Sequence, residues 1–250
     1  MSPVPRLPAL DLPWAEGIER FCAEAGEQLA REMAAPGSGG QIEHALLATY
    51  LEDLGLSRYA LGFPLDDVKE IFQLAARALL RVFELRGTEP DESLANSRRG
   101  REALLLALAA EDLALARSLA PHVEDPEGAS YLGPGSVVTT PDDQALAKAW
   151  RDLVLSRPIP PLTLTPQATP GALLEAAALE SLAAGDGASF RATLSRLVTW
   201  HEEQATREEH RHQPDWLLCL PGLALATLAV ERGVVGRGEL PGRSPYLPSF

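Results

Sequence analysis

Apolar residues recur along most of this chain at the spacing of helices. Between Trp14 and Ala35 they return every three or four positions, and glutamates fill the opposite face. This period predicts an amphipathic helix, which the glycine-rich run at 36–40 ends. A second helix is predicted from Gln41 to Leu54, with Gly55 as a left-handed cap.

The most regular apolar stripe predicts a third helix. It opens at Pro64, carries Asp66 and Asp67 in its first turn, and closes after Arg86 at Gly87. Proline suits the first position of a helix, and carboxylates in the first turn face free backbone N–H groups.

A fourth helix, expected from a cap at Asp91 to about Ala109, ends in a pattern that the chain uses twice. Residues 108–117 and 182–191 both read Leu-Ala-Ala-x-Asp-x-Ala-x-x-Arg. The pattern predicts a helix that ends at Ala-Ala, a one-residue turn and an Asp that caps the next helix. We interpret it as a helical hairpin like those of α-solenoids, with chance similarity in an Ala/Leu-rich chain as the alternative.

Two long segments interrupt the helical pattern. Residues 121–141 predict a surface loop or hinge, and residues 156–170, with five prolines, predict an extended crossing of the surface. The remaining helices are expected at 142–155, 170–184, 187–205 and 214–232. The chain is therefore predicted to be one all-α domain over 1–250, with roughly eight to ten helices in a bundle or in stacked antiparallel hairpins. If it has two halves, their boundary lies in one of these loops.

Composition and charge narrow the function. Hydrophobic residues make up 46% of the chain and aromatic residues only 6%, which allows a sizeable core and favours helices over sheets. The net charge of -13 argues against a nucleic-acid binder and would suit a basic protein partner. Cys22 and Cys219 stand in apolar patterns typical of buried thiols. The start has no signal peptide and no window predicts a membrane span, so we expect a cytoplasmic protein.

Familiar catalytic motifs are missing from the sequence. It has no phosphate-binding Gly-x-x-x-x-Gly-Lys, no Gly-x-Ser-x-Gly elbow and no His-Glu-x-x-His zinc motif. The segment 200–212 holds three histidines and four glutamates, but their spacing matches no common ligand pattern, and a solvated helix end is the preferred interpretation. We therefore predict no catalytic residue, no metal and no cofactor.

Two further charged clusters favour structural interpretations. Glu52 and Asp53 are expected to be solvated near a helix end, and the basic run 98–101 is expected to lie on a helix surface. The other acidic pairs suit the first turns of helices.

The last third of the chain resembles the immunity protein 49 family of bacterial polymorphic toxin systems. The resemblance rests on three motifs: Leu-Ala-Ala-Gly-Asp at 182–186, Leu-Pro-Gly-Leu-Ala-Leu-Ala at 220–226, and Ser-Pro-Tyr-Leu-Pro at 244–248. Weaker agreement covers 72–87, and a Pro/Gly-rich stretch at 235–245 departs from the family. The resemblance implies an all-helical cytoplasmic antidote that binds the toxin made by a neighbouring gene.

For such a role we hypothesise that an acidic surface with an aromatic anchor occludes the toxin. The candidate interface residues form two patches: Trp200, His201, Glu202 and Glu203, and Asp66, Asp67 and Glu70. Core packing is the alternative for Trp200, which follows Leu197 and Val198. The competing functions are a tetratricopeptide-like adaptor, which requires a concave row of polar residues across its hairpins, and a metal-dependent hydrolase.

Overall fold

A computed structural model describes residues 7, 10–34, 39–86, 92–125, 138–240 and 244–248. Within these ranges the chain forms nine α-helices and no β-sheet, which confirms the predicted all-α fold. The helices are α1 Leu12–Met33, α2 Gln41–Leu61, α3 Leu65–Glu84, α4 Ser97–Ala109, α5 Leu113–Leu119, α6 Pro141–Val154, α7 Pro170–Ala183, α8 Gly187–Ala205 and α9 Leu220–Glu231.

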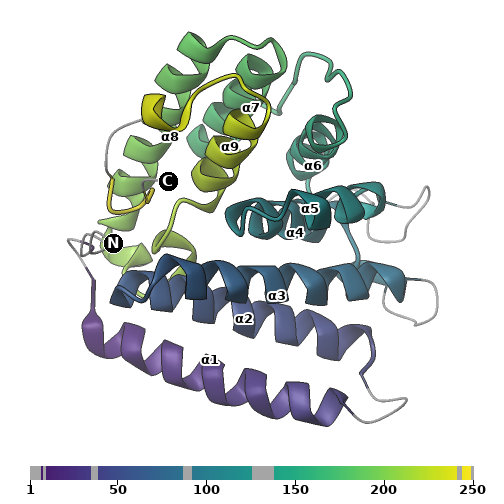
Figure 1. Cartoon of the computed structure of the whole chain (residues 1–250), viewed down its shortest axis with the longest axis vertical. Helices are drawn as coiled ribbons and strands as arrows, with labels where there is room; N and C mark the ends of the chain where they lie inside the picture. The colour runs from purple at the N-terminus through teal and green to yellow at the C-terminus, as the bar shows by residue number, and fades with distance from the viewer. Residues whose placement is uncertain are drawn as a thin grey trace.

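The helices stack in the order of the chain for its first half and then fold back. Helices α1, α2 and α3 lie side by side with α2 in the middle, and α4 packs on α3 (Figure 1). Helix α4 also contacts α6 and α9, while α7 and α8 form an antiparallel pair beside α9. Helix α4 therefore joins the N-terminal three-helix layer to the C-terminal third.

The prediction that α2 ends at Gly55 is wrong. The helix continues to Leu61, and Gly62 with φ 82° is the left-handed cap. Gly55 instead allows close packing, since a Cβ atom there would lie 2.5 Å from Cε1 of Phe72 on α3. Glycine is used at this position to bring two helices together and not to end one.

Two other predicted helix starts also shift. The cap proposed at Asp91 lies outside the described residues, and the side chain of Asn96 caps α4 by accepting from the Arg99 backbone N–H at 2.9 Å. The helix predicted from Pro214 begins only at Leu220, after a 3-10 turn over Pro214–Trp216. This start places Pro221 in the first turn of α9, where the absence of its N–H breaks no helical hydrogen bond.

The repeated hairpin pattern forms the predicted turn in both places. Each helix ends at the Ala-Ala pair, and the next residue, Glu111 or Gly185, adopts a left-handed conformation with φ 57° or 70°. Asp112 then accepts from the backbone N–H of Leu115 at 2.9 Å, and Asp186 accepts from two backbone N–H groups at the start of α8. The same residue pattern thus specifies the same local structure twice.

The proline-rich segment before α7 is tied down although it has no regular structure. Thr165 donates to the Asp142 carboxylate through its backbone N–H at 2.7 Å and its hydroxyl at 2.8 Å. Leu162 donates its backbone N–H to Glu180 at 2.7 Å. These bonds fasten the segment to α6 and α7.

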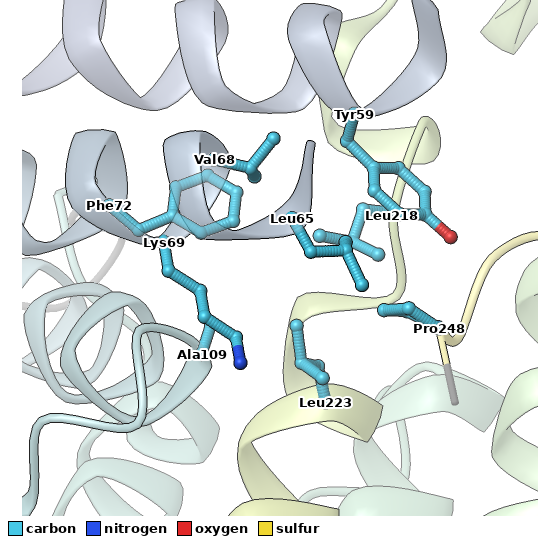
Figure 2. A pocket seen from close by; sticks show the side chains of 9 residues that line it. All are labelled: Tyr59, Leu65, Val68, Lys69, Phe72, Ala109, Leu218, Leu223 and Pro248. Carbon is cyan, nitrogen blue, oxygen red and sulfur yellow. The ribbon is translucent and has the colours of Figure 1, made fainter. Parts of the chain in front are cut away.

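The end of the chain packs against the N-terminal layer. The Tyr59 hydroxyl of α2 donates to the carbonyl of Pro245 at 2.7 Å, and Cys219 donates its backbone N–H to Tyr246 at 2.9 Å. Beside these bonds Pro248 faces Leu65 and Leu218 across an apolar cavity of about 30 Å³, room for one water molecule (Figure 2). One continuous apolar core runs through this seam, and both cysteines are buried and unpaired.

Candidate functional site

A cavity of about 650 Å³ lies between α2, α4 and the connection from α8 to α9. Three parts of the chain that are distant in sequence supply its walls. It is lined by Thr49, Glu52, Asp53, Asn96, Arg98, Arg99, Arg101, Glu102, Leu105, Val138, Trp200, His201, Asp215, Trp216, Leu220 and Pro221. The cavity combines carboxylates, guanidinium groups and two tryptophans.

Helix α2 contributes two half-buried carboxylates, which the sequence had predicted to be solvated. Because α2 continues past Gly55, Glu52 and Asp53 lie on the middle of the helix and face α4. Desolvation, and then the charge of Glu102, raises the pKa of Glu52 well above its ordinary value. Desolvation raises the pKa of Asp53 to about 6, and the charges of Asp215 and Glu102 add to the shift. Both carboxyl groups therefore keep their protons to a higher pH than they would in water.

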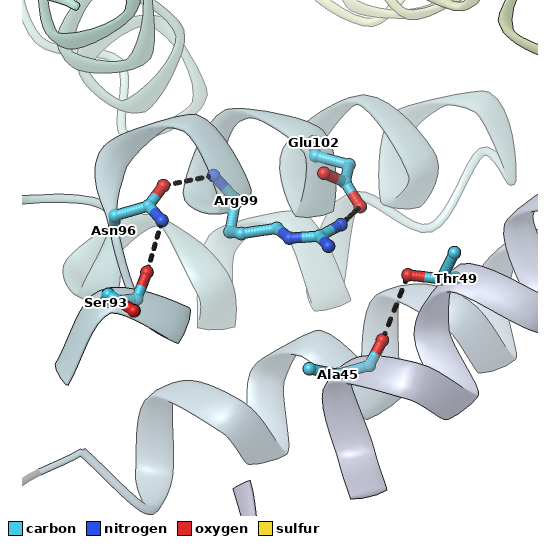
Figure 3. A network of polar contacts seen from close by, with 6 residues as sticks. All are labelled: Ala45, Thr49, Ser93, Asn96, Arg99 and Glu102. Atoms are coloured by element: carbon cyan, nitrogen blue, oxygen red, sulfur yellow. Dashed lines mark hydrogen bonds and ion pairs between the residues drawn. The ribbon is translucent and has the colours of Figure 1, made fainter. Parts of the chain in front are cut away.

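Helix α4 supplies the facing polar wall, which Figure 3 shows. Asn96 accepts from the Arg99 backbone and donates to the Ser93 carbonyl at 2.6 Å, so that the start of α4 is fixed. Arg99 forms an ion pair with Glu102 one turn later at 2.6 Å. Of the basic run 98–101, only Arg98 is exposed as predicted; Arg99 is half-buried against the cavity.

Arg101 lines the cavity and belongs to a charge network that extends behind it. Its guanidinium contacts both oxygens of Glu175, with the Nε bond at 2.7 Å, and the Glu175 side chain is only 3% exposed. Trp150 donates its indole N–H to the same carboxylate at 2.6 Å. A buried charge is tolerated when it is paired and hydrogen-bonded in this way. The network joins α4, α6 and α7 and holds the cavity wall in place.

Aromatic rings form the third wall. The ring of Trp200 packs edge-on to Trp216 at 5.6 Å between centroids, and it covers Gly171 so closely that a Cβ atom there would lie 2.3 Å from the ring. His201 is buried between Trp216 and Tyr246, and its Nε2 lies 3.2 Å from the Trp216 carbonyl. Desolvation lowers the pKa of His201 to about 4. His201 is therefore neutral at pH 7, and Nε2 donates to the carbonyl.

Residues 171–250 match the family model of immunity protein 49. This segment contains the motifs that carry the resemblance, and it supplies the aromatic wall with Trp200, His201 and Trp216. No curated protein matches the chain. No solved structure matches it either.

The matched segment, residues 171–250, also contains the whole of the first predicted patch. Glu202 is half-buried and accepts from the Ser244 hydroxyl at 2.5 Å, which fastens the end of the chain, whereas Glu203 is exposed. In the second patch Asp66, Asp67 and Glu70 are exposed on the first turns of α3. Of the seven candidates, only Trp200 and His201 line the cavity.

The histidines of the segment 200–212 go to separate partners. His210 stacks on Trp216 at 4.4 Å, while Nε2 of His212 lies 3.2 Å from the Asp11 carboxylate, because the chain turns after α8 ends at Ala205. In the described part of the chain no three His, Cys, Asp or Glu side chains gather as a metal site. Nor does any described helix have the length and apolarity to cross a membrane.

The polar walls of the cavity were not predicted from the sequence. Glu52 and Asp53 carried one usable signal, since an acidic pair in the middle of a helix has no free N–H groups to satisfy. Arg99 and Glu102 carried another, because their i,i+3 spacing favours an ion pair. Nothing in the sequence indicated that Asp215 would face them.

Proposed function

We propose that this protein is an immunity protein, which binds a bacterial toxin domain and neutralises it by covering its active surface. The observation that carries the proposal is the match of residues 171–250 to the immunity protein 49 family. The proposed action is binding and not catalysis, and the proposed place is the cytoplasm of a cell that carries a polymorphic toxin system.

We place the toxin interface around Trp200. Its neighbour Glu203 is exposed, as are Asp66, Asp67 and Glu70 on α3. Trp200 is half-buried at the cavity, so that part of a large aromatic surface is ready for contact. His201 is buried beneath it, and we assign it a positioning role: it orients Trp216, against which Trp200 packs.

The charge of this region supports a toxin with a basic surface. The chain as a whole carries a net charge of -13, and besides desolvation the charges of Asp215 and Glu102 raise the pKa of Asp53. A basic group brought close to these carboxylates would offset their charges, and complementary charge also speeds association.

Co-expression tests the proposed function. The protein encoded by the neighbouring gene is expressed in a bacterial host with and without this chain, and growth is measured. We expect the neighbour to arrest growth and this chain to restore it. A harmless neighbour, or a toxic one that this chain fails to neutralise, would contradict the proposal.

Charge reversal tests the interface. Glu203→Lys combined with Asp66→Lys should weaken toxin binding by about tenfold or more, because two exposed carboxylates become repulsive to a basic partner. Glu202 is left unchanged since its bond to Ser244 fastens the end of the chain. Glu24→Lys, an exposed change on α1, is the matched control. Equal affinity of the double variant and the control would place the interface elsewhere.

A further inference from the structure

An apolar groove runs along the N-terminal layer, on a different face of α2 from the cavity. Its walls come from α1 and α3 and its floor from α2, and its volume is about 580 Å³. Figure 1 shows these three helices side by side. It is lined by Ala23, Gly26, Glu27, Ala30, His44, Leu47, Leu51, Leu54, Arg58, Ile71, Leu74, Arg77, Ala78 and Arg81. None of these residues lines the cavity.

Small residues keep the groove open. On α1 the small residues that line it, beside Glu27, are Ala23, Gly26 and Ala30, whose spacing of three and four keeps them on one side of the helix. On α3, Ala78 faces them. Packing does not require the glycine, since a Cβ atom at Gly26 would come no closer than 3.8 Å to another side chain. The walls therefore stay apart because their side chains are too short to fill the space.

The floor and one wall of the groove are apolar. Leu47, Leu51 and Leu54 repeat along α2, and Leu74 on α3 is 46% exposed although it is a large hydrophobic residue. A contiguous apolar hollow in contact with water is typical of a binding surface.

The charged side chains that line the groove are mostly basic, although the molecule as a whole is acidic. Three arginines and one glutamate line it, in a chain with a net charge of -13. Arg58 and Arg81 form ion pairs with Glu19 at 2.9 Å and Glu84 at 2.7 Å, carboxylates that do not line the groove. The third arginine, Arg77, is exposed on α3. Guanidinium groups favour carboxylates as partners because they bind both oxygens at once.

We propose that this groove binds an amphipathic helix of another protein, whose apolar side chains are flanked by Asp or Glu. The apolar floor would take side chains at positions i, i+3 or i+4, and i+7, and the arginines would pair with the flanking carboxylates. A tetratricopeptide-like adaptor would require a polar row across successive hairpins, whereas this groove is apolar and lies within one layer. The inference does not depend on the proposed immunity function.

Two designed peptides test the groove without any toxin. Each is a labelled helix of about five turns with the same leucine face, flanked by Glu in one peptide and by Lys in the other. Binding to the full chain is measured by fluorescence anisotropy. We expect the Glu peptide to bind at least about tenfold more tightly. Equal affinities, or binding of neither peptide, would overturn the proposal.

Variants locate the binding. Ala30→Trp fills the groove from an exposed position and should abolish binding of the Glu peptide, while Arg77→Glu with Arg81→Glu should reverse the preference between the peptides. Arg196→Glu, an exposed change on α8, should alter neither affinity. Circular dichroism verifies folding, and the exposed double charge reversal tests the site even if Ala30→Trp does not fold. Unchanged preference in that double variant would contradict the groove as the site.

Discussion

Helix α2 separates two hollows of opposite character. Thr49, Glu52 and Asp53 face a cavity rich in charge, whereas Leu47, Leu51 and Leu54 face an apolar groove. The cavity is closed by α4 and the α8–α9 connection, which lie far away in sequence, while the groove is built by the immediate neighbours α1 and α3. The cavity holds desolvated carboxyl groups with raised pKa values, and the groove holds the solvent-exposed Leu74, so that each departs from an ordinary protein surface.

Comparing an ion pair at each hollow indicates where charged side chains stabilise the fold. At the cavity wall, Arg101 pairs with Glu175, and their side chains are only 20% and 3% exposed. Beside the groove, Glu27 and Arg31 form an ion pair at 3.6 Å with both side chains more than 70% exposed. Solvent screens the second pair much more than the first, and the first, together with Trp150, also joins three helices.

The largest effect is expected at the buried network. Glu175→Ala leaves the Arg101 charge and the Trp150 indole N–H without their partner, and we expect a loss of about 3–5 kcal/mol in the free energy of unfolding. Glu27→Ala at the groove should cost at most about 0.5 kcal/mol. Urea-induced unfolding of both variants measures the contrast, and similar losses would show that burial does not separate the two pairs.

The next comparison is between two glycines: Gly55 lies within α2, and Gly26 on α1 faces α2. Gly55→Ala places a Cβ atom against the Phe72 ring, so that α2 and α3 must move apart at a cost of about 1–3 kcal/mol. Gly26→Ala on the groove meets no such obstacle and should stabilise α1 by up to about 1 kcal/mol through helix propensity. Thermal unfolding should therefore shift in opposite directions. A stabilising Gly55→Ala would refute the close packing.

The carboxylates of the cavity predict a pH dependence. An unfolded aspartate releases its proton near pH 3.9, whereas folded Asp53 does so at about pH 6. Between these values the folded state binds more protons, so acidification from pH 7 to pH 5 stabilises the protein through Asp53. Asp53→Asn should be more stable than the parent at pH 7.5 by on the order of 1 kcal/mol, allowing for solvent screening, and the difference should vanish near pH 4.

Subtracting the stability of the parent from that of Asp53→Asn at each pH isolates the contribution of Asp53. His201 acts with the opposite sign, because its folded pKa of about 4 lies below the unfolded value near 6.5, so that acidification through pH 6.5 destabilises the fold. This contribution is present in both proteins and cancels in the difference. A difference between Asp53→Asn and the parent that does not change with pH would contradict the raised pKa.

The smallest effect is expected at the exposed edge of the groove. Leu74→Gln replaces an apolar side chain that is 46% exposed, and the free energy of unfolding should change by less than about 0.5 kcal/mol. Its affinity for the Glu-flanked peptide should nevertheless fall. A loss of stability above about 1 kcal/mol would mean that Leu74 belongs to the core and not to a binding surface.

The sequence by itself determined the helices, most of their local ends and the resemblance of the last third. Apolar periodicity, capping residues and the repeated Leu-Ala-Ala-x-Asp turn act over a few neighbouring residues, which is why α8 was predicted at Gly187–Ala205 and found there. The three motifs that resemble the immunity protein 49 family are also short stretches of sequence, so they could be recognised without the structure.

Tertiary structure alone decided what the polar residues face. Gly55 has the same sequence signal whether it caps a helix or admits Phe72, and the difference lies in a ring 17 residues away on another helix. Likewise Glu52, Asp53 and Asp215 share a cavity only because α2, α4 and the α8–α9 connection meet there. Desolvation and repulsion depend on such long-range proximity, for which a linear pattern of residues has no signal.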